Sequence, residues 1–399
     1  MGDLILPEAA WRRRAGMDRL CEVLGTDAAR FVGGAVRDTL LGLDVADVDL
    51  ATELPPEDVL DHVRAAGMKA VPTGLAHGTI TVVLPDGPVE VTTLRRDVAT
   101  DGRHATVAFT RAWEEDAARR DFTINALYAD PVSGTVFDYF GGVDDLAERR
   151  VRFIGDPLKR IAEDHLRILR FFRFQARFGA EVDADGLAAC TVRANDLMAL
   201  SRERIAAELL KLLLANRAVP TVRLMIKQGI FRPVLPEITN VDRLATLVDR
   251  EIGAGIAPSA IRRLAALLPP EAAIAEDVGA RLKLSKSDRR RLVSATFPAG
   301  TEPPQAIAYT LGTDLAIDRL LLSDRPGADA QAIGDWQAPR LPVSGGVLVE
   351  RGVRKGPEVA TLLRTIEAEW VRAGFPDKDQ LDGIVAAALD QWRRDSSNA

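Results

Sequence analysis

The stretch that decides the fold is FVGGAVRDTLLGLDVADVDL, residues 31–50. It starts as an apolar strand and continues through Gly33 and Gly34 into a short amphipathic run that Gly42 is placed to end. Adjacent glycines let bare backbone N–H groups approach an anion, and the start of a helix favours phosphate. This segment therefore predicts a strand, a glycine turn and a helix in succession.

Two aspartates, Asp47 and Asp49, close this stretch on either side of Val48. If they lie on a strand, period-2 alternation puts both carboxylates on one face. A glycine pair alone is more often a tight turn, and Asp-x-Asp occurs by chance in acidic proteins. The two features together, with Arg37 and Asp38 between them, favour a site for a nucleoside triphosphate and its magnesium ion.

A predicted β-hairpin follows. Residues 79–84 and 89–94 alternate between apolar and polar side chains, and Asp86-Gly87 between them is a strong turn signal. We expect Glu90 to join the same sheet as the two aspartates and to point away from its apolar neighbours. It is a candidate third carboxylate, and an ordinary solvent-facing glutamate fits the pattern equally well.

The next residues are more polar. Residues 95–109 contain glycine and predict a mobile loop beside the site. In the run RRDFTINAL, residues 119–127, Arg119, Arg120 and Asn125 are placed to reach phosphate or ribose, although a capped helix with a solvated basic start is the better interpretation of this run alone. Beyond about residue 150 almost everything is helical, so the predicted fold class is α+β, with a small mixed sheet followed by an all-α half.

Residues 156–179 predict one helix with many arginines along one side. These are Arg160, Arg167, Arg170, Arg173 and Arg177. Because few acidic residues lie nearby in sequence, a negatively charged ligand is the favoured partner, and acidic residues elsewhere in the fold are the alternative. The later run SRERIAAEL, which begins at Ser201, predicts a capped helix with a structural role.

Asp164 and Arg167 are three residues apart and would be neighbours on such a helix. They would present a hydrogen-bond acceptor beside a donor. Adenine and cytosine offer an exocyclic amino donor beside a ring-nitrogen acceptor, whereas guanine and uracil offer the reverse pattern. This pair therefore predicts selection of A and C, because G or U would leave buried polar groups unpaired.

Composition limits the class of protein. The 399 residues are 47% hydrophobic and 28% charged, with a net charge of −6, as in a soluble globular protein of two or three domains. No apolar run approaches a membrane span, and the N-terminal residues lack a signal-peptide pattern. Only Cys21 and Cys190 are present, which predicts a reducing, cytoplasmic setting without disulfides. All four histidines precede residue 166, which excludes a histidine metal site from the C-terminal half.

The motifs GGAVRD with DVD, VEVTTLR, RRDFTINAL, EDHLRILRFFRF and SRERIAAEL occur in this order. The series resembles that of the bacterial-type (class II) CCA-adding and poly(A) polymerase family, strongly over residues 28–215 and loosely elsewhere. The resemblance implies a polymerase-β-like nucleotidyltransferase head and a helical neck, body and tail. The implied domains are a catalytic head at 1–150, a neck with the base-selecting helix at 151–217, a body at 218–320 and an RNA-binding tail at 321–399.

The resemblance also implies roles for individual residues. Asp47 and Asp49 would hold Mg²⁺ and act in catalysis, with Glu90 as a third catalytic carboxylate. The implied nucleotide-binding residues are Gly34, Arg37, Arg120, Asp164, Arg167, Arg170 and Arg173. The implied reaction is template-independent addition of CCA to the 3′ end of tRNA from CTP and ATP.

Alternatives within the family are poly(A) polymerase and partial CC- or A-adding enzymes. The acidic chain has no long basic C-terminal extension of the kind that the resemblance associates with poly(A) polymerases. Residues 95–109 also look full length, whereas the corresponding loop of CC-adding relatives is shorter. Both features favour complete CCA addition. An inactive RNA-binding protein is the alternative from another class, and intact Asp47 and Asp49 argue against it. The turn at residues 352–357 places Arg354 and Lys355 before a helix, which suits contact with an RNA backbone. No membrane partner is expected.

Overall fold

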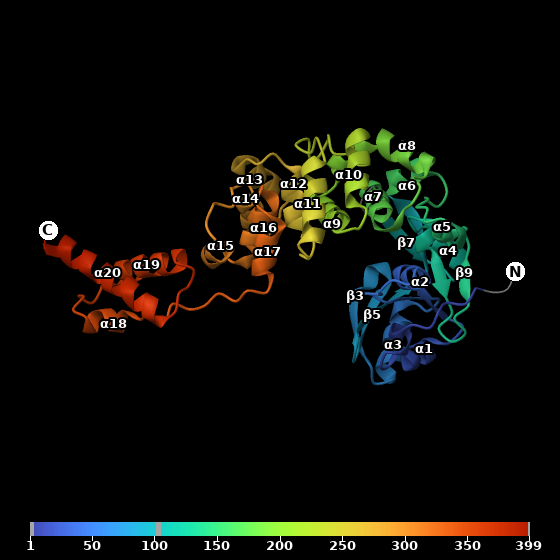
Figure 1. Cartoon of the computed structure of the whole chain (residues 1–399). Helices are drawn as coiled ribbons and strands as arrows, with labels where there is room; N and C mark the ends of the chain where they lie inside the picture. Colours follow the sequence, from blue (N-terminus) through green and yellow to red (C-terminus); the bar gives the residue numbers. More distant parts are fainter. Residues whose placement is uncertain (1–3, 101–104, 398–399) are drawn as a thin grey trace. The chain divides into compact units, whose positions relative to one another are not determined.

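A computed structural model of the chain describes residues 4–100 and 105–397. The chain forms two compact units, Met1–Pro236 and Glu237–Ala399 (Figure 1). The strands, all in the first unit, are β1 (Ala29–Val32), β2 (Asp49–Thr52), β3 (Lys69–Gly74), β4 (Thr79–Leu84), β5 (Gly87–Thr93), β6 (Arg95–Thr100), β7 (Ala105–Phe109), β8 (Leu127–Ala129) and β9 (Val136–Asp138).

Seven strands form one mixed sheet in the order β3-β4-β5-β2-β1-β8-β9. Only the β2–β5 pair is parallel, and the predicted hairpin is confirmed as β4 and β5. The α+β prediction is therefore confirmed. The prediction of a loop at residues 95–109 is wrong for the described residues, because β6 and β7 pair as a separate two-stranded sheet, while residues 101–104 lie outside the described part. The β-branched Val and Thr residues in the sequence before and after Gly102 favour strands.

The two faces of the large sheet have different environments. On one face, Phe31, Leu50 and Val91 are fully buried and lie in register across β1, β2 and β5. The helix α3 (Pro56–Ala65) packs on β3, β4 and β5 and contacts α1 (Met17–Leu24). Because alternate residues point to opposite faces, Asp49 and Glu90 lie on the other face.

The other helices of the first unit are α2 (Gly34–Leu40), α4 (Trp113–Ala118), α5 (Gly142–Ala147), α6 (Pro157–Glu163), α7 (Arg167–Phe178), α8 (Ala184–Val192), α9 (Arg202–Leu213) and α10 (Ala218–Lys227), with 3-10 turns at Ala10–Arg13, Leu75–His77, Thr123–Asn125 and Ala194–Ala199. The single helix predicted for residues 156–179 is wrong. Asp164 ends α6 in an extended conformation, with φ −149° and ψ 107°. Its Oδ1 accepts the backbone N–H of Leu166 at 3.1 Å, which competes with helix continuation.

An aromatic cluster fixes α7 against the strand-rich part of this unit. Phe122 and Phe153 form an isolated β-bridge, and their ring centroids are 4.8 Å apart. Phe171 stacks on Phe153 at 5.7 Å, and Phe174 meets the edge of Phe122 at 5.6 Å. Burial of several aromatic rings in one cluster is strongly stabilising, so these rings hold α7 against the segments that carry Phe122 and Phe153.

The second unit is helical in all its regular elements within the described residues. Its helices are α11 (Asp242–Gly253), α12 (Ala260–Leu267), α13 (Ala272–Arg281), α14 (Lys286–Ser294), α15 (Pro304–Leu311), α16 (Thr313–Leu322), α17 (Gly327–Gly334), α18 (Gly345–Glu350), α19 (Pro357–Arg372) and α20 (Lys378–Ser397). Leu348, Ile366, Trp370 and Val385 form a core that joins α18, α19 and α20.

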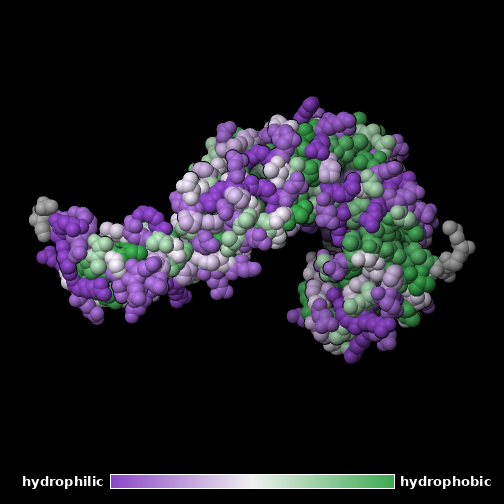
Figure 2. Space-filling model, viewed as in Figure 1, coloured by the Kyte–Doolittle hydropathy of each residue, from purple (hydrophilic) through white to green (hydrophobic). Residues whose placement is uncertain are grey.

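Hydrophilic residues cover much of the visible surface of α19 and α20 (Figure 2). Their apolar residues are instead gathered in the buried core that these helices share with α18. Across the described ranges, no helix combines the length and the apolar character needed to cross a membrane.

Candidate active site

A single row of residues across the large sheet defines the candidate site. Asp49 on β2 is in register with Glu90 on β5 and with Val32 on β1, and Val32 is in register with Tyr128 on β8. Residues in register on neighbouring strands point to the same face. The expectation that Glu90 lies on the same sheet as Asp49 is therefore confirmed, and the two residues are direct neighbours on adjacent strands.

Asp47 lies two residues before the strand on which the sequence predicts it. β2 begins at Asp49, and Asp47 belongs to the segment before it. Burial still alternates through this segment, because Asp47 is exposed, Val48 is buried and Asp49 is half-buried. Among the described residues, none donates a hydrogen bond to the carboxylate of Asp47 or Asp49, so their oxygens are available to a ligand.

The electrostatics of this row favour a bound cation. Burial, followed by repulsion from Glu90 and Asp47, raises the pKa of Asp49 to about 6, although Arg120 acts in the opposite direction. Within the described residues, no three His, Cys, Asp or Glu side chains form a ready metal cage. Mg²⁺ is usually bound by one or two carboxylates with water and substrate phosphates, so the Asp47 and Asp49 pair fits this ion.

The glycine turn, Gly33 and Gly34, directly follows Val32, which belongs to this row. Gly33 has φ +69° and ψ −120°, a conformation that side chains other than hydrogen disfavour. Its N–H donates to the carbonyl of Leu127 at 3.0 Å, and a Cβ there would lie 3.5 Å from Nη1 of Arg120. Because α2 has only seven residues, the anion-binding capacity of this turn rests on its backbone and on Arg120.

The glycine requirement at this turn is testable. We expect Gly33→Ala to destabilise the chain by about 1–3 kcal/mol and to reduce nucleotide affinity, because a side chain strains the backbone at this φ and the new Cβ comes into contact with Arg120. Gly42→Ala is the matched control: Gly42 has φ +67°, but no atom lies within 4 Å of the place that a Cβ would take there. Thermal unfolding should show that both variants are destabilised by backbone strain. Nucleotide titration should show a loss of affinity only in Gly33→Ala. Equal affinity in the two variants would contradict this role.

Arg120 is held by a buried network that the sequence did not reveal. Its Nη2 donates to Oδ2 of Asp116 at 3.0 Å and its Nε to the hydroxyl of Tyr128 at 3.1 Å. Tyr128 also donates to Asp116 at 2.7 Å, and Arg119 lies 2.7 Å from the same carboxylate. Burial alone would raise the pKa of Asp116, but Arg120 and Arg119 lower it to about 2.

This network corrects the interpretation of residues 119–127 as the solvated start of a helix. Arg119 instead follows the end of α4, and both arginines are largely buried against Asp116. The four-residue spacing between Asp116 and Arg120 was the available signal. Asp116 is therefore a positioning residue that aims Arg120 at the row.

Arg37 and Asn125 are brought together, but inside the fold. Arg37 is only 4% exposed, and its Nη1 donates to Oδ1 of Asn125 at 2.5 Å. Its Nε donates to Asp38 at 2.8 Å. Burial lowers the pKa of Arg37, although Asp38 opposes this effect. In this structure Arg37 therefore anchors α2.

The arginines of α6 and α7 all have acidic partners, so the expectation that they lack them is wrong. The alternative, partners elsewhere in the fold, is what the structure shows. The ion pairs are Arg160 with Glu163, Arg167 with Glu163 (2.5 Å), Arg170 with Asp121 (2.6 Å), Arg173 with Glu208 (2.8 Å) and Arg177 with Asp38 (3.0 Å). Several of these acids are distant in sequence, which is why local charge counting missed them.

Asp164 and Arg167 are near each other in the chain but bind different partners. Nη2 of Arg204 lies 3.1 Å from Oδ1 and 2.9 Å from Oδ2 of Asp164. Arg167 donates to Glu163 and to the carbonyl of Arg160. No hydrogen bond joins the two side chains in the described structure. The acceptor and the donor therefore remain separate, as the predicted selection of the base would require.

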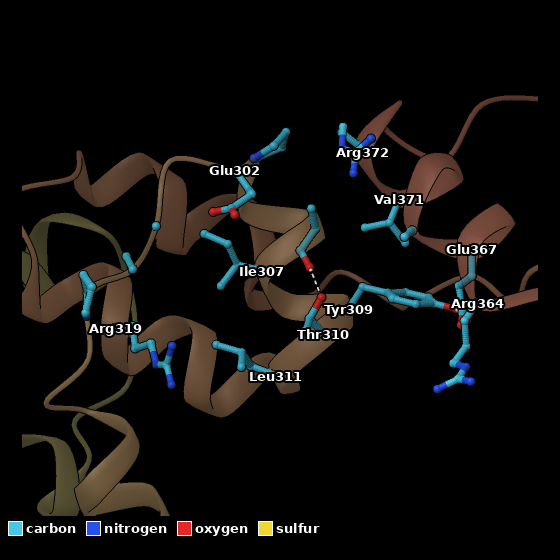
Figure 3. Close-up of a pocket in the computed structure, with 16 residues that line it drawn as sticks. Glu302, Ile307, Tyr309, Thr310, Leu311, Arg319, Arg364, Glu367, Val371 and Arg372 are labelled. Carbon is cyan, nitrogen blue, oxygen red and sulfur yellow. Dashed lines mark hydrogen bonds between the residues drawn. The ribbon is translucent and has the colours of Figure 1, made fainter. Parts of the chain in front are cut away.

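A cavity of about 710 Å³ lies in the second unit between α15 and α19 (Figure 3). Arg319, Arg364 and Arg372 line it, and Tyr309 donates a hydrogen bond to Glu367 at 2.6 Å. Burial and this hydrogen bond raise the pKa of Tyr309 to about 12. None of the predicted catalytic or nucleotide-binding residues lies in its lining, so it is separate from the candidate active site.

The mixed sheet, glycine turn and carboxylate row define a nucleotidyltransferase head. Residues 29–152 match the family model of the poly A polymerase head domain, and residues 180–241 match a model described as a probable RNA and SrmB- binding site of polymerase A. The chain is 37% identical over 372 residues to the mitochondrial CCA tRNA nucleotidyltransferase 1 of Danio rerio, covering 88% of this chain and 85% of that protein.

Bacterial relatives of this chain are also CCA-adding enzymes. The CCA-adding enzyme of Levilactobacillus brevis is 30% identical over 385 residues, covering 91% of this chain and 94% of that protein. The crystal structure of the Bacillus stearothermophilus CCA-adding enzyme in complex with CTP superposes with a TM-score of 0.70 at 25% identity, covering 96% and 98% of the two chains. The chain belongs to the CCA tRNA nucleotidyltransferase family, and the family resemblance of its motifs is confirmed.

Proposed function

We propose that this enzyme adds C, C and A to the 3′ end of tRNA from CTP and ATP in a template-independent, Mg²⁺-dependent reaction. The observation that carries the proposal is the row in which Asp49 and Glu90 lie beside the glycine turn and Arg120. The family relationship supports the tRNA substrate. Solved structures of CCA-adding enzymes with a similar fold include complexes with CTP, ATP and tRNA.

Transfer joins the RNA 3′ oxygen to the α-phosphate and releases pyrophosphate, while the hydroxyl proton leaves to solvent. When bound by Asp47 and Asp49, Mg²⁺ would lower the pKa of this hydroxyl and offset the charge of the α-phosphate. The backbone of Gly33 and Gly34 and the guanidinium of Arg120 would hold the remaining phosphates. Glu90, directly beside Asp49, is the proposed third catalytic carboxylate.

Base selection is assigned to Asp164 as acceptor and Arg167 as donor. Arg37, Arg170 and Arg173 are proposed to contribute to nucleotide binding through donors that their ion pairs leave over, since a guanidinium carries five N–H groups. Their acidic partners would keep them in fixed positions before a nucleotide binds. This arrangement lowers the entropy cost of binding.

Arg167→Ala is expected to relax base choice. Without the donor, the site loses the feature that distinguishes cytosine from uracil, so the preference for CTP over UTP should fall about tenfold or more. Single-turnover incorporation with each nucleotide measures this preference. An unchanged preference in a folded variant would exclude Arg167 from base selection.

The remaining assignments follow from the same proposal. We assign the head to residues 1–150, the neck to 151–217, the body to 218–320 and an RNA-binding tail to 321–399. Contact of the tail with the RNA backbone is supported by the Arg354 and Lys355 turn before α19. A cytoplasmic location is supported by Cys21 and Cys190, which are both free and buried.

The direct test uses separate nucleotides. Incubated with a tRNA transcript that lacks its CCA end, the enzyme should add two residues from CTP alone. With a transcript ending in CC, it should add a single residue from ATP, and chelation of Mg²⁺ should stop both reactions. A long ladder from ATP would indicate poly(A) polymerase, and no incorporation with any nucleotide would indicate an inactive RNA-binding protein. Each of these two results would contradict the proposal.

A further inference from the structure

Arg204, near the start of α9, holds a residue that is 40 positions earlier in the chain. Its Nη2 bridges both carboxylate oxygens of Asp164, while Oδ1 of Asp164 also accepts the N–H of Leu166. We infer that Arg204 is a positioning residue for base selection, which fixes Asp164 as an acceptor beside Arg167. The inference rests on the proposed base-selecting role of that pair.

A tether is needed because the two selecting side chains carry opposite charges. Asp164 lies in the break between α6 and α7, and 31% of its side chain is exposed. Arg167 follows three residues later. Opposite charges this close form a charge-assisted hydrogen bond with each other unless other groups hold them. If they paired, neither would remain available to the edge of a base, and discrimination would be lost.

Arg167 is tethered independently of Asp164. Its Nη1 donates to Oε2 of Glu163 at 2.5 Å and to the carbonyl of Arg160 at 2.6 Å, and its Nη2 to the carbonyl of Arg119 at 3.2 Å. Among the described residues, Oδ2 of Asp164 accepts only from Arg204. Oδ2 therefore keeps lone pairs for an exocyclic amino group.

The tether on Asp164 comes from a rigid element. The N–H of Arg204 lies 3.4 Å from the hydroxyl of Ser201, which caps α9. Farther along, α9 packs on α7, and Glu208 of α9 lies 2.8 Å from Arg173 of α7. Arg204 therefore projects from the same packed helix pair that carries Arg167. The run SRERIAAEL is predicted to have a structural role, and the contact of Arg204 with Asp164 adds a role at the proposed site.

The test compares three variants of the full-length enzyme. Arg204→Gln removes the charge, Arg204→Lys keeps an ammonium that can still bridge two oxygens, and Arg193→Gln is the matched control. The Arg193 ion pair with Asp196 has side-chain exposures of 36% and 30%, against 40% and 31% for Arg204 with Asp164. The readout is the ratio of kcat/KM for CTP over UTP on a tRNA without CCA, and for ATP over GTP on a tRNA ending in CC.

We expect Arg204→Gln to lower both ratios about tenfold or more, Arg204→Lys to lower them less, and Arg193→Gln to leave them unchanged. In an Asp164→Asn background, Arg204→Gln should have no further effect, because Arg204 acts through that carboxylate. A purely structural role would lower the rate for all four nucleotides alike.

Unchanged ratios in folded Arg204→Gln would overturn the inference, as would equal losses in Arg193→Gln or a full further loss in the Asp164→Asn background. If Arg204→Gln does not fold in a thermal melt, Arg204→Lys decides, and unchanged ratios in that variant overturn the inference. A wild-type enzyme that incorporates U and G as readily as C and A would instead overturn the proposed base selection itself.

Discussion

Asp47→Ala is expected to reduce nucleotide transfer by about 10³-fold or more while leaving the fold intact. Asp47 supplies half of the two-carboxylate site proposed for Mg²⁺, and Asp49 alone would leave the attacked phosphate poorly neutralised. The folded state loses little, because Asp47 is exposed and accepts no hydrogen bond among the described residues. Such a surface substitution changes the free energy of unfolding by about 0.5 kcal/mol or less.

The control for this variant is Asp44→Ala. Asp44 is an exposed carboxylate in the same segment before β2, three positions earlier, so its removal changes the local charge equally. Single-turnover incorporation of CTP, with circular dichroism to verify folding, compares the two variants. Transfer by Asp47→Ala at a rate within tenfold of that of Asp44→Ala would show that Asp47 does not hold the metal.

Asp318→Asn is expected to destabilise the second unit by about 3 kcal/mol or more. Asp318 is fully buried, and it accepts from Nη1 of Arg262 at 3.3 Å and from Nε and Nη2 of Arg291 at 2.5 and 2.9 Å. Arg262 is itself 2% exposed and also pairs with Glu251. Removing the negative charge leaves buried guanidinium groups without full compensation, which costs more than the hydrogen bonds alone.

Hydrogen exchange measured by mass spectrometry localises this effect. Exchange should accelerate in α12 and α16, which carry Arg262 and Asp318, and stay unchanged in strands β1 and β2 of the first unit. Asp314→Asn, an exposed position one turn earlier on α16, should change exchange only slightly. Equal protection of α16 in the two variants would mean that the buried ion pairs do not stabilise the unit.

The local parts of the fold were predictable because their signals are local. The β4–β5 hairpin follows from alternation and an Asp-Gly turn, and the glycine turn follows from two adjacent glycines. Alternation also predicts that Glu90 and Asp49 face the same side of a shared sheet, whereas the parallel pairing of β2 with β5 sets their register. These features include the centre of the candidate site.

The missed features depend on contacts between distant residues or on competition within a short segment. Glu208 and Asp121 neutralise arginines of α7, and no local pattern reveals such pairs. The break at Asp164 was missed because arginine and leucine spacing continues through it, while the side chain bonds to the N–H of Leu166. The strands β6 and β7 were missed because polar residues and a glycine dominated the pattern.

The most direct test of the central claim is to supply all four nucleotides together with a tRNA that lacks its 3′ CCA and to sequence the product ends. If Asp164 and Arg167 select the base while Asp47 and Asp49 support transfer, the products should end in CCA with no further residues. Products ending in a run of A, or containing U or G at comparable frequency, would contradict the account.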